Sequence, residues 1–212
     1  MPLKWQGYLV IFVVAASALI ANFISLHDPI IDNYELAERL FALNGYIAIS
    51  FATIMTPLLK PESGSIGEQS DRSLRKLHYL LASLGLALAT AHPISVALRD
   101  LSFQVFIPRI DSWSFFWMNA GTPALYILYI AFIAALVRRK ITRYWRQFHA
   151  LMYIVLFLVI VHANLLGTDF QNPVVSALFD VLFAASILAF PVNRMQGYLK
   201  KRNAAVGDPK KS

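Results

Sequence analysis

Six long stretches of the sequence are almost free of charged residues, and this pattern constrains the fold more than any other feature. The hydrocarbon core of a bilayer is about 30 Å thick, so a helix needs about 20 apolar residues to cross it. Overall, 58% of the residues are hydrophobic and only 15% are charged, whereas soluble domains contain about 25% charged residues. The pattern predicts an all-α integral membrane protein, a bundle of six transmembrane helices at residues 7–26, 40–59, 77–98, 112–137, 147–168 and 172–191.

These spans predict one membrane domain over residues 1–192. The fourth stretch is longer than a span, and its aromatic beginning, Ser112 to Trp117, is expected to lie at the headgroup level. Residues 193–212 are rich in Lys and Arg and are expected to form a basic cytoplasmic tail without fixed structure.

The loops between the spans differ strongly in charge. If the spans alternate in direction, sixteen Lys and Arg residues fall on one side, and only Arg39, Arg99 and Arg109 fall on the other. Cytoplasmic loops carry the excess of basic residues. We therefore expect both termini in the cytoplasm, and a multi-pass protein of the plasma (inner) membrane with lipid as its first partner.

Several classes of protein are excluded by composition. The chain has no cysteine, so it holds no disulfide, no iron–sulfur cluster and no covalently attached c-type haem. The net charge of +7 comes from residues at the ends of apolar spans, which indicates membrane topology and no nucleic-acid partner. No phosphate-binding glycine loop is present.

Four of the five histidines lie in two spans: His78 and His92 in the third, His149 and His162 in the fifth. Ionisable residues inside a membrane are costly and usually mark function. The intervals are fourteen and thirteen residues, or about 21 Å and 19–20 Å of helix. Because both spans start on the cytoplasmic side, the four histidines predict two facing pairs at two depths, as axial ligands of two stacked haems would be.

The direction of the side chains around each helix supports this prediction unevenly. At about 100° per residue, His78 and His92 lie about 40° apart on one face, but His149 and His162 lie about 140° apart. Tilt or a local π-type turn would be needed to bring both rings of the fifth span inward.

The surroundings of the histidines favour haem over a bare metal ion, because the neighbours are mostly aliphatic and offer no carboxylate. Arg75 and Arg146 each precede a histidine by three residues and are candidates to bind haem propionates, as Arg99 and Arg109 are on the outer side. Alternatively, these arginines only set the topology.

Five segments carry a resemblance to a known family: Met55-Thr56-Pro57-Leu58-Leu59-Lys60, Arg75-Lys76-Leu77-His78, Ala91-His92-Pro93, the run from Tyr144 to Tyr153, and His162. From about residue 40 to 191 the chain resembles the ferric reductase-type transmembrane domain of NADPH oxidases, ferric reductases and the bacterial haem-binding subunit MsrQ (YedZ). The resemblance implies b-type haems held by His78 with His149 and by His92 with His162. In size the chain is similar to MsrQ, although some MsrQ proteins have arginine at the position of His78.

The resemblance implies an electron-transfer subunit of an oxidoreductase. Electrons would come from a cytoplasmic flavin reductase or reduced flavin, with flavin on the partner or loosely bound. They would pass through the two haems to an outer-side acceptor, for example a molybdopterin methionine sulfoxide reductase. Two alternatives stay open: a histidine-lined proton or ion transporter without haem, in which Asp180 takes part, and a structural scaffold subunit.

Overall fold

The computed structural model describes residues 5–27, 32–59 and 65–206, and within these ranges the chain is helical and contains no strand. The long helices are α1 (Trp5–His27), α2 (Asn33–Ile54), α3 (Ser65–Arg99), α5 (Gly121–Leu136), α7 (Met152–Leu166) and α8 (Pro173–Val206). Shorter pieces connect or extend them: η1 (Thr56–Leu59), η2 (Phe103–Phe106), α4 (Trp113–Met118), α6 (Trp145–His149) and η3 (Thr168–Gln171).

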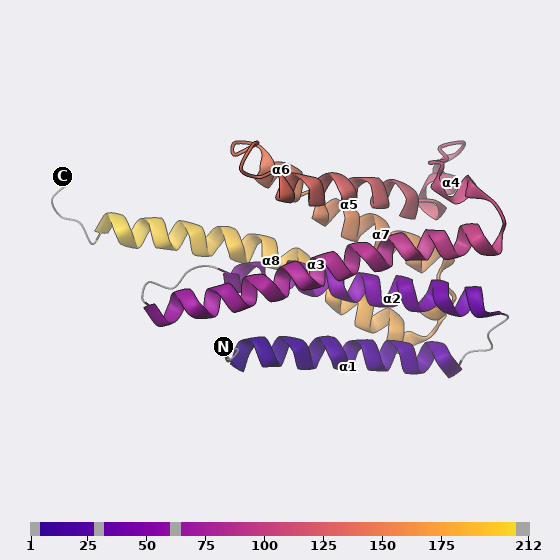
Figure 1. Cartoon of the computed structure of the whole chain (residues 1–212), viewed down its shortest axis with the longest axis horizontal. Coiled ribbons are helices and arrows are strands. Elements are labelled where there is room, and N and C mark those ends of the chain that lie inside the picture. Colours follow the sequence, from indigo (N-terminus) through magenta and orange to yellow (C-terminus); the bar gives the residue numbers. More distant parts are fainter. Residues whose placement is uncertain (1–4, 28–31, 60–64, 207–212) are drawn as a thin grey trace.

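The six long helices lie side by side and alternate in direction along the long axis of the molecule (Figure 1). The start of α1, the start of α3, the turn between α5 and α6 and the end of α8 all lie at the left-hand end of Figure 1. The ends of α1, α3 and α7 lie at the right-hand end. The expected order of the segments is therefore present in the fold.

Four helical segments are long and apolar enough to cross a membrane: 7–27, 73–99, 145–166 and 173–199. The helix α5 is apolar but has only 16 residues, which is about 24 Å of helix. The helix α2 is long enough, but it begins with charged residues and carries Asn44 and Tyr46 farther along. Length and composition therefore indicate a helical membrane protein, in which four helical segments of the described residues could cross the membrane; α2 and α5 do not meet both criteria.

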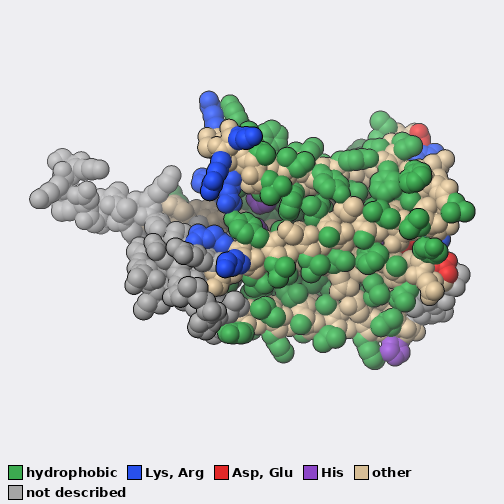
Figure 2. Space-filling model, viewed as in Figure 1, with side chains coloured by type: hydrophobic (Ala, Val, Ile, Leu, Met, Phe, Trp, Pro, Cys, Tyr) green, Lys and Arg blue, Asp and Glu red, His purple; other side chains and the backbone are tan. Residues whose placement is uncertain are grey.

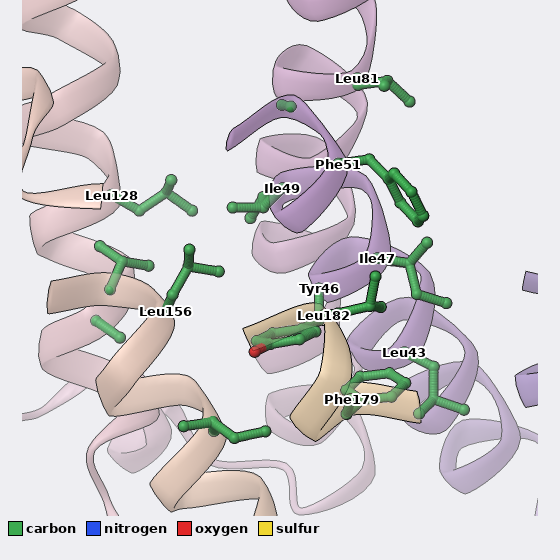
Figure 3. Close-up of a cluster of buried hydrophobic side chains, with 14 of the residues drawn as sticks. Leu43, Tyr46, Ile47, Ile49, Phe51, Leu81, Leu128, Leu156, Phe179 and Leu182 are labelled. Atoms are coloured by element: carbon green, nitrogen blue, oxygen red, sulfur yellow. The ribbon is translucent and has the colours of Figure 1, made fainter. Parts of the chain in front are cut away.

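The helix α2 is buried at the centre of the bundle, where it contacts α1, α3, α7 and α8. Tyr46 of α2 stacks on Phe179 of α8 with ring centroids 4.9 Å apart, and both lie in the main apolar cluster (Figure 3). Gly45 and Gly85 allow the backbones of α2 and α3 to approach closely, since a Cβ at Gly85 would lie 2.5 Å from Cγ1 of Ile49. Polar residues in α2 are therefore tolerated because other helices cover them.

The helix α1 is joined to α2 by a pair of amide side chains. Asn22 donates to Asn44 at 3.2 Å, and Asn44 donates back to Asn22 at 2.8 Å. Around this pair, α1 turns its small buried residues Ser17, Ala21 and Ser25 toward the bundle, an arrangement that lets membrane helices pack tightly.

Two expectations about the ends of spans have different outcomes. The aromatic segment after Ser112 forms a separate short helix, α4, capped by the Ser112 hydroxyl; its position at the headgroup level stays a prediction. The tail was expected to lack fixed structure from residue 193, but α8 continues to Val206, so this expectation is wrong for residues 193–206. Lys, Arg, Leu, Met and Ala dominate that segment and are strong helix formers. Residues 207–212 lie outside the described residues.

Candidate functional site

The structure brings His78 and His149 together near one end of the bundle. Their ring centroids are 6.5 Å apart and their planes are inclined by 75°. Two imidazoles bound to one metal at a metal–nitrogen distance of about 2.0–2.1 Å would have centroids roughly 6–6.5 Å apart. The separation of this pair therefore suits two axial ligands of a single metal ion.

The second pair, His92 and His162, lines a common cavity of about 560 Å³ toward the other end of the bundle. This volume lies within the range of about 300–1,000 Å³ that is typical for cofactor-sized ligands. All four histidines are partly buried. The structure thus brings His78 close to His149 and places His92 and His162 in one cavity, and their pairing as ligands stays a prediction.

Each of the four rings makes the same kind of hydrogen bond. The Nδ1 atoms of His78 and His92 lie 2.9 Å and 3.0 Å from the carbonyl oxygens of Ala52 and Glu38. The Nδ1 atoms of the other two histidines lie 3.2 Å and 2.6 Å from those of Ala131 and Met118.

A carbonyl oxygen only accepts hydrogen bonds, so in all four cases Nδ1 carries the proton and donates it. Nε2 then keeps its lone pair and is ready to bind a metal ion. A second nitrogen held by a carbonyl or carboxylate is the usual support for a histidine ligand, because it fixes the tautomer and the ring orientation.

The partners of these bonds follow from the antiparallel packing of consecutive helices. Ala52 and Glu38 are fourteen residues apart in α2, the same interval as His78 and His92 in α3. Ala131 in α5 and Met118 at the end of α4 are thirteen residues apart, the same interval as in the other histidine pair. The two histidines of α3 are therefore supported by α2, and the two histidines of α6 and α7 by α4 and α5, the segments that precede them in the chain.

A local turn between His149 and His162 accounts for part of the difference from an ideal helix. The span that carries His149 and His162 is divided into α6 and α7, and two amides at the junction bond three residues back: Leu151 to Phe148 and Tyr153 to Ala150, both at 3.1 Å. A 3₁₀ turn advances about 120° per residue instead of about 100°. Each residue in a 3₁₀ turn therefore adds about 20° of rotation, which brings the directions of His149 and His162 closer together. Of the two possibilities, tilt or a π-type turn, the junction shows no π-type turn; it is overwound instead, which closes part of the difference of about 140°.

The two histidine-bearing hairpins face each other across the cavity. Leu128 and Leu156 line one side, and Ile49 and Tyr46 line the other (Figure 3). The backbones of α2 and α3 pack along most of their length, but those of α3 and α5 approach each other at few places. The middle of this cavity is therefore lined by apolar side chains, with His92 and His162 at its border and charged side chains toward its end, a surrounding that suits a porphyrin with its propionates.

Gly121, the first residue of α5, leaves room for the ring of His162. A Cβ at this position would lie 3.0 Å from Nε2 and 3.1 Å from Cδ2 of that ring. Within the described residues, no group of three or more His, Asp or Glu side chains is placed to hold a metal ion. A haem needs only two protein ligands, because the porphyrin supplies four nitrogens. The residues present fit a haem.

The charged residues differ between the two ends of the bundle. Lys and Arg side chains gather at one end, beside a hollow in which a histidine is visible, and Asp and Glu side chains appear at the other end (Figure 2). Arg75 is partly buried one turn before His78. Arg146 is exposed, and its guanidinium lies 5.6 Å from the ring of Trp145, which in turn lies 6.1 Å from the ring of His149.

At the other end, Arg99 and Arg109 both line the cavity that contains His92 and His162. Arg99 is already engaged, because it binds Glu38 at 2.6 Å and Asp100 at 3.0 Å. Arg109 binds Asp111 at 3.1 Å. A propionate at this end would therefore share these arginines with acidic side chains.

Sequence reasoning missed several residues of the site. The four carbonyls have no sequence signal, since every residue carries one; only the equal intervals in neighbouring spans could have indicated them. The Arg138 side chain donates to the hydroxyl of Tyr79 at 2.8 Å, and the Tyr79 ring lies 5.8 Å from that of His78. This contact borders the pair formed by His78 and His149 and was also not expected.

The fifth histidine is not part of the site. His27 ends α1, where its Nδ1 lies 2.7 Å from the Phe23 carbonyl and its ring packs against the Phe23 ring. Comparisons with protein-family models, curated proteins and solved structures found no match.

Proposed function

We propose that the chain is an integral plasma (inner) membrane protein that binds two b-type haems and carries electrons across the membrane. The observation that supports this most strongly is the common state of the four histidines. All four donate through Nδ1 to a backbone carbonyl, which leaves four Nε2 atoms free in two pairs. His27 makes the same kind of bond within its own helix, but the four candidate ligands bond to carbonyls of other segments and lie in two pairs, an arrangement that is typical of metal ligands.

In this proposal the protein supplies ligation, spacing and an apolar surrounding, and bound haem supplies one-electron redox chemistry. The hairpin of α2 and α3 holds one ligand of each pair, and the segments from α4 to α7 hold the other. The fixed tautomers keep Nε2 unprotonated. The aliphatic residues of the cavity exclude water, which leaves the charge of each site to its ligands and nearby arginines.

The direction of electron flow is inferred from charge. Arg75, Arg146 and the loop Arg138–Arg143 make the end of the bundle near His78 and His149 basic. This end corresponds to the cytoplasmic side by the positive-inside rule. A flavin reductase carries an anionic cofactor, so its encounter with a basic surface is favoured electrostatically. The chain would then be the electron-transfer subunit of an oxidoreductase, reduced by a cytoplasmic flavin reductase or reduced flavin.

The acceptor would bind at the opposite end, beside His92 and His162. By its resemblance to the MsrQ subunit, the chain would pass electrons to a reductase on the outer side, such as a molybdopterin methionine sulfoxide reductase. The cavity of the outer pair reaches the charged residues at this end, including Arg99 and Arg109, so the second site lies close to the face where such a partner would bind.

The test is a reduced-minus-oxidised absorption spectrum of protein purified from haem-replete cells. We expect b-type bands and two haems per chain. His78→Ala or His149→Ala should remove one haem, His92→Ala or His162→Ala should remove the other, and double variants should group by pair.

Other outcomes would favour the alternatives. A chain without haem bands that conducts protons or ions would be a transporter, and the haem proposal would then be abandoned. If all four histidines can be replaced without loss of function, the chain is a scaffold. Haem loss that does not group by pair would contradict the proposed ligand assignment, even if haem is bound.

A further inference from the structure

The two histidine-bearing hairpins are joined in different ways on the two sides of the cavity. On one side, α8 packs against α2 of the first hairpin and α7 of the second. There Phe179 stacks on Tyr46, and Oγ of Ser186 lies 3.4 Å from the carbonyl oxygen of Ser50. On the other side, the α3–α5 interface, the two backbones approach each other at few places, and Figure 1 shows α5 above α3 there. Only the first side is therefore closed by a packed core.

One hydrogen bond crosses the middle of the α3–α5 interface. The hydroxyl of Tyr129 in α5 lies 2.7 Å from Oγ1 of Thr90 in α3. Thr90 donates its only side-chain proton to the carbonyl oxygen of Leu86 at 2.7 Å, so Tyr129 is the donor of the bond between the two helices. Because Thr90 lies between His78 and His92 in α3, this bond crosses the interface between the heights of the two histidine pairs.

Two more tyrosines make such bonds at the two ends of the interface. Where α3 leads into η2, the hydroxyl of Tyr126 in α5 donates to the carbonyl oxygen of Phe106 at 2.7 Å. At the other end, next to His78, the hydroxyl of Tyr79 accepts from the guanidinium of Arg138 at 2.8 Å. Long polar side chains thus connect α3 and α5 where their backbones do not pack.

The α3–α5 interface lies at the surface of the bundle. Tyr79 is 46% exposed and Tyr126 is 44% exposed. The other large exposed side chains of α5 are apolar: Ile130, Ile133 and Leu136. In a membrane this side would face lipid. A tyrosine bond breaks when one side chain changes its rotamer, so this side of the cavity opens with fewer lost contacts than the side that α8 covers.

One end of the cavity is closed by ion pairs. Arg99 binds Glu38 at 2.6 Å, and Arg39 lies 3.7 Å from Asp169, a pair that joins α2 to η3. Both carboxylates are buried. Parting such pairs to admit an apolar molecule would leave buried charges without compensation, which is strongly unfavourable. A route between α3 and α5 avoids this cost.

We propose that haem enters and leaves the cavity sideways, between α3 and α5, and that the hydrogen bonds of Tyr79, Tyr126 and Tyr129 form the gate of this route. A porphyrin is flat and largely apolar, so it dissolves in the bilayer and reaches the interface from the lipid. Its edge passes between the two helices while the three bonds are open. When the bonds form again, the hairpins hold the ring between their histidines.

This inference rests on the proposed binding of haem. The two are tested apart, because the haem content of the purified chain reports binding, whereas the rate of haem release reports the gate.

Release of haem from the loaded chain tests the gate, since a molecule that enters by one route also leaves by it. The chain is reconstituted in phosphatidylcholine vesicles and mixed with excess apomyoglobin, and the transfer of haem is followed at the Soret band. Tyr129→Phe removes one hydrogen bond across the interface and should speed release about two- to tenfold. Tyr153→Phe is the matched control, because the Tyr153 ring packs at 5.2 Å on Phe190 of α8 on the packed side. Its release should keep the wild-type rate.

A reversible cross-link tests the route itself, since the chain has no cysteine of its own. Thr90→Cys and Tyr129→Cys are combined in one chain, which is loaded with haem and bridged with a short bis-methanethiosulfonate reagent. The bridge should abolish release, and dithiothreitol should restore it by cleaving the bridge. A control bridge joins Asn22→Cys to Asn44→Cys, because these two side chains bond to each other between α1 and α2, away from the interface. It should leave the rate unchanged.

Equal helix content and equal haem content at the start check that each variant folds and is loaded. Release that continues through the bridged α3–α5 interface would overturn the gate and assign the route to an end of the cavity, with haem binding intact. Equal acceleration in Tyr129→Phe and Tyr153→Phe would mean a general loosening of the bundle and no gate. A wild-type chain without haem would end the proposed function and the gate together.

Discussion

Replacing Gly121 by Ala should weaken binding of the outer haem without destabilising the chain. The added Cβ would lie 3.0 Å from Nε2 and 3.1 Å from Cδ2 of His162. Non-bonded carbon contacts are about 3.5–4.0 Å, so the ring would have to retreat by roughly 0.5 Å. The ring is held from the other side by the 2.6 Å bond between Nδ1 and the Met118 carbonyl. It therefore retreats only by lengthening that bond or by displacing Nε2.

The expected loss of haem affinity in Gly121→Ala follows from the role of Gly121 in positioning the His162 ring. Changes to the groups that orient a metal ligand typically reduce affinity about 10–100-fold. We expect that reduction for the outer haem, measured by titrating the haem-free chain with haem and following the Soret band, while the inner haem binds as in the wild type. The apo chain should unfold at the same or a slightly higher temperature, because Ala is up to about 1 kcal/mol more favourable than Gly in a helix.

A double-mutant cycle isolates the contact. In a His162→Ala chain the ring is absent, so Gly121→Ala should have no further effect on haem content. If it lowers haem content by the same factor in both backgrounds, the methyl group acts somewhere else. Wild-type affinity in the single variant would show that His162 does not hold the haem in the position described.

Three further predictions concern the packing and the basic end. Gly85→Val should lower the free energy of unfolding by about 1–3 kcal/mol through overpacking against Ile49; an unchanged melting temperature in detergent would contradict the close approach of α2 and α3. Asn22→Leu leaves Asn44 without its amide partner and should weaken the packing of α1 on α2 by about 1–2 kcal/mol. Proteolysis of α1 should then be faster than in Leu19→Ala, a control on the exposed face of α1. Replacing Arg138, Arg139 and Lys140 by Gln should slow reduction by a flavin reductase and flatten its salt dependence at unchanged haem content, since exposed charges are screened within about 8–10 Å; reduction only from the outer face of oriented vesicles would reverse the proposed direction.

The positions of the helices and the grouping of the histidines could be predicted because both follow from intervals along the chain. Uncharged runs mark the apolar helices, and alternating direction places His78 beside His149. The turn between α6 and α7 could not be predicted, since neither Gly nor Pro marks residues 145–152. The overwinding there is a consequence of packing, because both rings must meet carbonyls on the preceding hairpin partner.

The helix that extends through residues 193–206 was missed for a different reason. Clustered Lys and Arg indicate a cytoplasmic segment, but they say little about its conformation, because the same residues favour helix. The exposed position of Asp180 was also beyond the sequence. A single acid in an apolar run gives no indication of which face it occupies until the neighbours of α8 are known.

The support of each histidine pair by its own preceding helix has a consequence for biogenesis. When α3 enters the membrane, α2 has already been synthesised, so the carbonyls for His78 and His92 are in place before the second half of the chain exists. The second half contains its own acceptors in the same way. Each half can therefore acquire its ligand geometry alone. The halves meet where α8 packs against α2, and because α3 and α5 touch at few places, the group that occupies the cavity would add the link between these two helices. Insertion of the cofactor would then be the last step of assembly, and two separately expressed fragments divided between α3 and α4 should associate more tightly when haem is supplied.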